Sequence, residues 1–148
     1  MRHEIRLATE EDIQFVAQHL RATDATEIWA SHRRRPEDLP DACREVECYC
    51  GLLDGVPVCL FGCNDCGSFG APWLLGTDMM ALVPVSVLRE SRRRVRQWLE
   101  RYRLLTNYVH AKNRVSMDWL SWLGFRFPDS AIVNGELFWR FEMRCEYV

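Results

Sequence analysis

The sequence lacks the features that place a chain in a membrane or on nucleic acid. No stretch of its 148 residues approaches the roughly 18 consecutive apolar residues of a membrane-spanning helix. The opening residues, MRHEIRLATEED, contain no apolar signal region. The net charge is −2, so no overall basic surplus is present to attract a polyanion. We therefore expect a cytosolic protein without a membrane span and without a nucleic-acid partner.

Internal repeats and low-complexity linkers are also missing, which favours a single domain over residues 1–148. A chain of this length buries roughly 70% of its unfolded surface and needs no disulfides for stability. Hydrophobic residues make up 48% of the sequence and aromatic residues 11%, a composition typical of globular proteins. The cysteine count, seven, is odd. Reduced and mostly buried thiols are therefore expected.

Four of the cysteines raise the question of a metal site. Cys48 and Cys50 lie on one side of a predicted hairpin, and Cys63 and Cys66 on the other. Four thiolates at the ends of such a hairpin suit Zn²⁺. However, a Cys-x-Cys pair in a strand places both side chains on one face, whereas zinc knuckles use two Cys-x-x-Cys pairs. The prediction is no metal, with zinc as the alternative.

Hydrophobic periodicity and turn signals predict alternating strands and helices. Thr9 and Asp12 form a near capping box that starts a helix. Asp54-Gly55 is the strongest hairpin signal in the chain. Ser86 is expected to cap a long helix. The remaining assignments are strands at 3–7, 73–80 and 104–110, helices at 39–46, 86–102 and 115–123, and two final strands about a turn at 134–135.

The order of these elements predicts a mixed α/β sheet. An antiparallel meander comes first, and strand–helix–strand units follow from residue 73. Right-handed crossovers make the strands of such units parallel. We expect a mostly antiparallel sheet with a central parallel pair, flanked by about four helices.

This element order resembles the GNAT superfamily of acyl-CoA-dependent N-acetyltransferases, and the resemblance is sharpest in NYVHAKNRVSMDWLSWLGF, residues 107–125. The family pattern there is an Asn, a small residue three later, and Gly-Phe at eleven and twelve. Asn113, Ser116, Gly124 and Phe125 match it. The Asn ends a strand and caps a helix, and the Gly turns the chain into the next strand.

A narrower resemblance covers residues 72–127. PWLLGTD, RESRRRVRQWLERY and LTNYVHAKNRVSMDWLSWLGF are similar to a GNAT-like family described as an internal virion or virion-assembly protein of podophages. This resemblance implies a phage or prophage origin, a place in the host cytoplasm or the virion, and a role late in infection.

The GNAT resemblance also implies acetyl-CoA as the coenzyme. The family binds the pyrophosphate on backbone N–H groups of a Gly-rich loop at a helix start. The matching segment here, MALVPVSVLRES, contains no Gly, and its Pro84 has no N–H. The residues that the resemblance places against the coenzyme are Met80, Leu82, Val83, Ser86, Arg89, Asn113 and Ser116.

Acetyl transfer needs a base for the amine and a proton for the departing thiolate. Leu120 stands where the family usually has a Tyr acid, and Leu carries no proton to give. Asp78 and His110, at the ends of two predicted neighbouring strands, are the candidate catalytic residues, with Gly76, Asp78 and Met80 on one strand face. The alternative is that Asp78 pairs with an Arg and His110 is a structural strand-end residue.

Trp98, Trp119 and Trp122 lie on the two long predicted helices. They are expected to pack in the core; exposed together, they would form a protein-binding patch.

Two functions therefore follow from the sequence. The first is a phage GNAT-fold interaction protein, internal to the virion or active in morphogenesis, with a degenerate acyl-CoA site and phage or host protein partners. The second is an active acetyl-CoA-dependent N-acetyltransferase that modifies an amine of a host or phage molecule.

Overall fold

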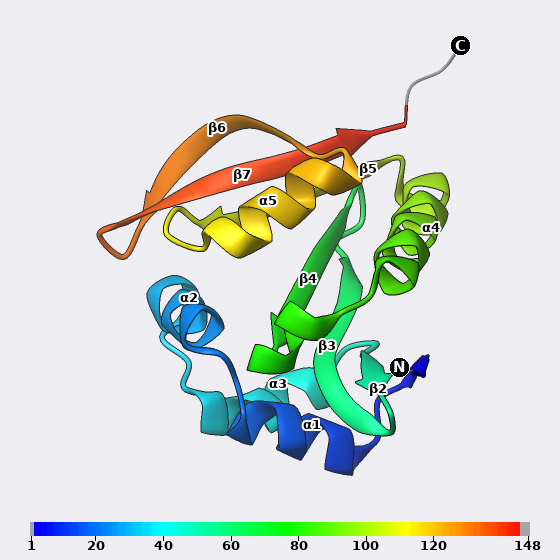
Figure 1. The fold of residues 1–148 in the computed structure, drawn as a ribbon. Coiled ribbons are helices and arrows are strands. Elements are labelled where there is room, and N and C mark those ends of the chain that lie inside the picture. Colours follow the sequence, from blue (N-terminus) through cyan, green and yellow to red (C-terminus); the bar gives the residue numbers. More distant parts are fainter. Residues whose placement is uncertain (1, 146–148) are drawn as a thin grey trace.

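The computed structural model describes residues 2–145, in which seven strands form one sheet of order β1-β2-β3-β4-β5-β7-β6 (Figure 1). Only the β4–β5 pair is parallel among these strands, and the other pairs are antiparallel. The predicted sheet type is thereby confirmed. The strands are β1 His3–Leu7, β2 Tyr49–Leu53, β3 Val56–Asp65, β4 Gly70–Gly76, β5 Leu104–His110, β6 Arg126–Val133 and β7 Glu136–Arg144.

The helices include one that the sequence pattern did not indicate. This helix, α2, follows α1 directly and carries Asp24 on its buried side. A carboxylate on the buried side breaks the apolar period by which an amphipathic helix is recognised. The helices are α1 Glu10–Gln18, α2 Ala22–His32, η1 Pro36–Asp38, α3 Leu39–Arg44, η2 Asp78–Leu82, α4 Val85–Tyr102 and α5 Arg114–Leu123, where η denotes a 3₁₀ helix.

Local signals in the sequence set several boundaries correctly. Thr9 and Asp12 form the predicted capping box at the start of α1. Asp54 and Gly55, with φ of 50° and 80°, connect β2 to β3 in the left-handed conformation that such a two-residue turn requires. Asn113 caps α5 with its side chain, and Gly124 ends it at φ 105°. These are short-range effects, which explains why they can be predicted.

Two boundaries near the predicted coenzyme loop were wrong. The strand expected to reach residue 80 ends at Gly76, because the Thr77 side chain accepts the N–H of Met79 and starts η2. Asp78 and Met80 therefore belong to a 3₁₀ helix and do not alternate with Gly76 on a strand face. The cap of α4 is Pro84 and not Ser86, since proline has a backbone angle suited to a helix start.

The parallel pair diverges soon after it begins. In the described chain, β4 and β5 pair at Gly70 and Leu105, and beyond this point the strands separate (Figure 1). Gly70 is required here, because a β-carbon at this residue would lie 2.6 Å from the Tyr102 ring and 2.7 Å from Cys63 Sγ. The sheet thus consists of two halves joined at one end.

Each half of the sheet has its own hydrophobic core. Helices α4 and α5 pack on β5 and β7, while α1 and α3 pack on β2 and β3 (Figure 1). The opening between β4 and β5 therefore does not interrupt either core. The first core is formed by Ile13, Val16, Cys43, Cys48, Cys50, Leu52 and Leu60, and the second by Val95, Leu105, Val109, Phe125 and Phe141.

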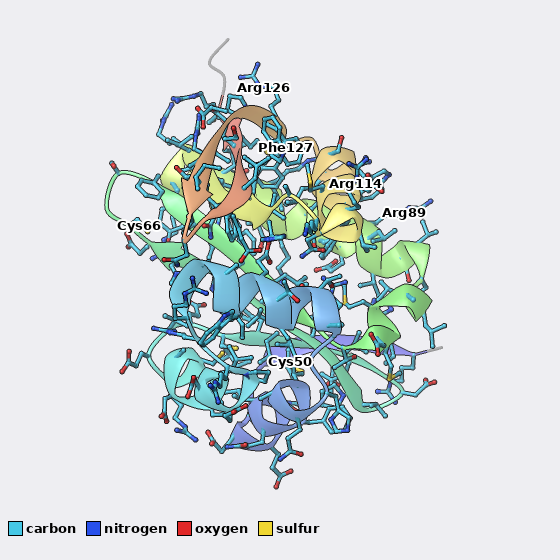
Figure 2. All side chains as sticks on the ribbon, turned by 90° about the vertical axis from the view of Figure 1, so that its left-hand side faces the viewer. Cys50, Cys66, Arg89, Arg114, Arg126 and Phe127 are labelled. Carbon is cyan, nitrogen blue, oxygen red and sulfur yellow. The ribbon has the colours of Figure 1, made fainter. Side chains whose placement is uncertain are left out.

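All seven cysteines are free. Cys48 and Cys50 are buried, whereas Cys66 is exposed, and Figure 2 shows Cys50 and Cys66 in separate parts of the molecule. Within residues 2–145, no three His, Cys, Asp or Glu side chains are grouped as metal ligands. No helix of this part of the chain is long and apolar enough to cross a bilayer.

Candidate functional site

A cavity of about 730 Å³ includes the region where β4 and β5 diverge. Its volume is in the range of small-molecule sites in proteins. The two strands, the helices α4 and α5 and the edge of α2 all contribute to its lining. Around the opening, the lining residues are Glu27, Pro72, Leu74, Val87, Ser91, Asn107, Val109, Ser116, Trp119 and Leu120.

A side-chain amide joins the two strands at the narrow end of the opening. Asn107 Nδ2 donates to the carbonyl of Pro72 at 2.9 Å, and Asn107 Oδ1 accepts the N–H of Tyr108 at 2.8 Å. The carboxamide thus occupies the place of a peptide group between β4 and β5. It satisfies one backbone group on each strand where the distance is too great for a direct bond.

Helix α2 joins the strands at the wide end. Asp24 Oδ2 accepts the N–H of Gly76 at 2.8 Å, and the N–H of Arg21 donates to the Gly76 carbonyl at 2.9 Å. Glu27 Oε1 accepts the N–H of His110 at 2.6 Å. The carboxylates of α2 therefore terminate both strands, Asp24 on β4 and Glu27 on β5.

Leu74 lies between these two connections on the open edge of β4. Pro72 and Gly76 direct backbone groups toward the opening, as their bonds to Asn107 and Asp24 show. The alternation of an antiparallel ladder directs the N–H and C=O of Leu74 to the same side. A donor and an acceptor thus face the cavity in the geometry that accepts an added extended chain.

Asp24 is held in place by a buried ion pair. Its side chain is fully buried, and Arg21, which is 8% exposed, places Nε 2.7 Å from Asp24 Oδ2. Asn113 Nδ2 donates to Asp24 Oδ1 at 3.3 Å, and Arg21 Nη2 donates to Ser116 Oγ at 3.1 Å. Because both of its oxygens accept hydrogen bonds from groups of other elements and from Arg21, Asp24 holds α2 in position.

Glu27 is the group in the site that is suited to proton transfer. Burial raises the pKa of the Glu27 carboxyl to about 7, against hydrogen bonds from the His110 N–H and the Asn113 amide that favour the charged form. The neighbouring Asp24 carboxylate raises it further. A carboxyl with this pKa is partly ionised at neutral pH, as a general base requires. Sequence reasoning did not find Glu27 because α2 itself was not predicted; the i, i+3 spacing of Asp24 and Glu27 was the available signal.

His110 lies beside Glu27, but its ring is directed elsewhere. Nδ1 accepts the N–H of Lys112 at 3.2 Å, so the ring proton is on Nε2, which donates to Glu136 Oε1 at 2.7 Å. The ring also meets the Phe138 ring edge-on, with centroids 5.1 Å apart. His110 is at the strand end where it was predicted, and it contacts Glu27 through its backbone N–H.

The other predicted site residues fall into two groups. Met80, Val83 and Ser116 line the cavity. Asn113 is buried outside the lining, and its side-chain amide donates to Asp24 and Glu27. The exposed residues, outside the lining, are Asp78, Leu82, Ser86 and Arg89.

Two exposed arginines lie near the helix starts at this edge. Arg89 is one turn into α4, and Arg114 is the first residue of α5. Figure 2 shows both side chains on the same side of the molecule. The N–H groups of Val87 and Leu88 donate to the Pro84 carbonyl. The N–H groups of Val85 and Ser86, at the very start of α4, have no carbonyl one turn earlier in the helix to donate to. The helix start and the two guanidinium groups suit an anion.

The comparisons with known proteins identify the fold. No protein-family model matches the chain, and no curated protein is similar to it in sequence. Among solved structures, an N-acetyltransferase from Staphylococcus aureus Mu50 is similar with a TM-score of 0.72 and 13% identity, over 97% of this chain and 99% of that one. An aminoglycoside acetyltransferase, AAC(6')-Ib, in complex with coenzyme A has a TM-score of 0.70 and 14% identity, over 97% and 95% of the two chains.

PaiA N-acetyltransferase from Thermoplasma acidophilum, also in complex with coenzyme A, has a TM-score of 0.70 and 14% identity, over 98% of this chain and all of its own (100%). At these identities the similarity concerns the backbone arrangement. The chain therefore has the fold of the GNAT N-acetyltransferases.

Proposed function

We propose that the chain binds an acyl-CoA in the opening between β4 and β5 and transfers the acyl group to an amine. The observation that carries this proposal is that Leu74, on the open edge of β4, and Glu27, at the end of β5, line the same cavity. Two of the similar structures hold coenzyme A, which supports the choice of ligand.

The residues present fit the pantetheine arm better than they fit the phosphates. The arm is an extended chain with two amides, and the N–H and C=O of Leu74 can bond to such a chain as a neighbouring strand would. Arg89, Arg114 and the free N–H groups at the start of α4 would hold the phosphates. No glycine brings the backbone close at this loop, so charge and not a tight cradle is expected to bind them.

Glu27 is the proposed general base, in the place that Asp78 and His110 were expected to fill. Glu27 takes a proton from the acceptor amine, the amine nitrogen bonds to the acyl carbon, and the carbon–sulfur bond breaks. The thiolate then takes a proton from solvent, because Leu120 has none to give. His110 is proposed as a positioning residue for Glu27, and Asp78 as a second candidate base for comparison.

A second function is favoured by the surface at the start of α4. Leu82 and Val85 are 56% and 59% exposed, which puts apolar surface where phosphates would lie. Such surface suits a protein partner. Together with the sequence resemblance of residues 72–127, it supports the alternative proposal of a phage-encoded interaction protein, internal to the virion or active in its assembly in the host cytoplasm, whose coenzyme site has degenerated.

Calorimetric titration with acetyl-CoA, followed by an acetyl-transfer assay on a set of amines, separates the two. A micromolar dissociation constant with transfer that depends on Glu27 supports the enzyme. The absence of both binding heat and a rise in melting temperature at millimolar coenzyme would exclude the enzyme, because a bound ligand must stabilise the folded state. The absence of coenzyme binding is the result expected of the degenerate site.

A further inference from the structure

One buried polar group of the described chain has no partner. Trp119 Nε1 is fully buried, and it is the only such side-chain nitrogen or oxygen in residues 2–145 without a hydrogen bond. The indole of Trp73, by contrast, donates to Asn64 Oδ1 at 3.0 Å. Buried donors in folded proteins nearly always have an acceptor, so the exception at Trp119 calls for one.

The position of Trp119 relates this donor to the cavity. Trp119 is on α5, one turn beyond Ser116 and adjacent to Leu120, and all three residues line the cavity. Residues three and four apart lie on one face of a helix. Trp119 is therefore on the helix face that borders the cavity, next to Leu120, and its buried N–H belongs to the packing layer of this wall.

We propose that the Trp119 indole N–H donates a hydrogen bond to an amide carbonyl of the pantetheine arm of the bound acyl-CoA. This inference rests on the proposed function and names a residue of its binding site. The arm's two amides supply neutral carbonyl oxygens, which is the kind of acceptor that a buried, uncharged donor binds without a counter-charge.

A phosphate oxygen is a poorer match. Phosphate is bound in proteins by guanidinium groups and exposed helix starts, and here those are at Arg89 and Arg114. Trp119 is five residues beyond Arg114, about 7.5 Å along the helix axis. The charged end and the unpaired indole are thus two separate parts of the same elongated site.

The direct test is to follow the indole N–H signals of ¹⁵N-labelled protein by NMR during titration with acetyl-CoA and, separately, with S-acetyl-pantetheine. The chain has six Trp, and the Trp119→Phe variant assigns the signal of residue 119 by its absence. We expect this signal to move downfield with both ligands, while the already bonded Trp73 signal changes little. A shift with acetyl-CoA alone would place the acceptor in the nucleotide and contradict the proposal.

Affinity gives the second measurement. Trp119→Phe should weaken binding of both ligands about 5-fold, the effect of losing one neutral hydrogen bond. The matched control is Trp122→Phe on the same helix, whose ring is exposed and stacked by Arg92 at 3.7 Å, and which should bind as the wild type does.

The outcomes separate this assignment from the proposed function. If the wild type binds both ligands without a shift of its Trp119 signal, and Trp119→Phe binds them as tightly as the wild type does, the assignment of Trp119 is wrong, while the proposed function stands. If the wild type binds neither ligand, both are wrong.

Discussion

Glu27 Oε1 and the backbone N–H of His110, 83 residues apart in the chain, are joined by a 2.6 Å hydrogen bond. This bond attaches α2 to the end of β5 and places the Glu27 carboxyl at the wide end of the opening. The second oxygen of the carboxyl accepts a longer hydrogen bond, of 3.4 Å, from the Asn113 amide.

Replacing Glu27 by Gln should lower kcat/KM for acetyl transfer by at least about 100-fold, the usual contribution of a general base. The affinity for acetyl-CoA, measured by calorimetry, should stay within about twofold, because the amide keeps the acceptor for the His110 N–H. Glu11→Gln, on the exposed side of α1, is the matched control. A loss of this size in Asp78→Asn, with Glu27→Gln close to the wild type, would assign the base to η2 instead.

The stability of the protein should depend on the protonation of Glu27. Its pKa of about 7 in the folded state is above the ordinary 4.5, so the folded chain binds this proton more tightly than the unfolded chain does. The free energy of unfolding should therefore fall by up to about 3 kcal/mol as pH rises from 4.5 to 7, and then level off.

Urea denaturation at a series of pH values checks this, with Glu27→Gln as the reference. The difference between wild type and variant isolates Glu27 from the other titrating groups. A difference that does not change over this pH range would show that Glu27 titrates normally. In the transfer assay the sign is the opposite: kcat/KM should rise with pH through about 7, because the base must be ionised.

The Arg21–Asp24 pair should be important for stability, because both side chains are buried. Arg21→Met leaves the Asp24 carboxylate without its counter-charge and should destabilise the fold by about 3–5 kcal/mol. Adding Asp24→Asn removes the buried charge and should restore part of this loss. Denaturation of the two single variants and the double variant measures the coupling, and additive effects would contradict the pairing.

Asn107→Ala should destabilise the protein by about 1–2 kcal/mol, because the Pro72 carbonyl and the Tyr108 N–H both lose their partner. Asn107→Asp retains the acceptor for Tyr108 but faces the Pro72 carbonyl with an oxygen, and it should be no more stable than the alanine variant. Chemical denaturation checks both. A wild-type stability in either variant would show that the opening does not need this bridge.

Around α5, prediction from the sequence worked because the causes are local. The Asn113 cap and the Gly124 stop act within a few residues of themselves, so their spacing was enough to place the helix and, by resemblance, the fold. For α2 it failed because the cause is distant. Asp24 and Glu27 are tolerated on the buried side of a helix because Arg21 pairs with Asp24 and because Gly76, His110 and Asn113 donate to the two carboxylates.

The sequence by itself therefore determined the order of strands, the turns and caps, and the mixed sheet with its parallel pair, since each follows from periodicity or short-range hydrogen bonding. The tertiary structure alone decided where the carboxylates lie, that Asp78 is exposed on η2, and that Trp119 has an unpaired N–H beside a cavity. These depend on groups brought together from distant parts of the chain, and burial among them is what changes the pKa of Glu27.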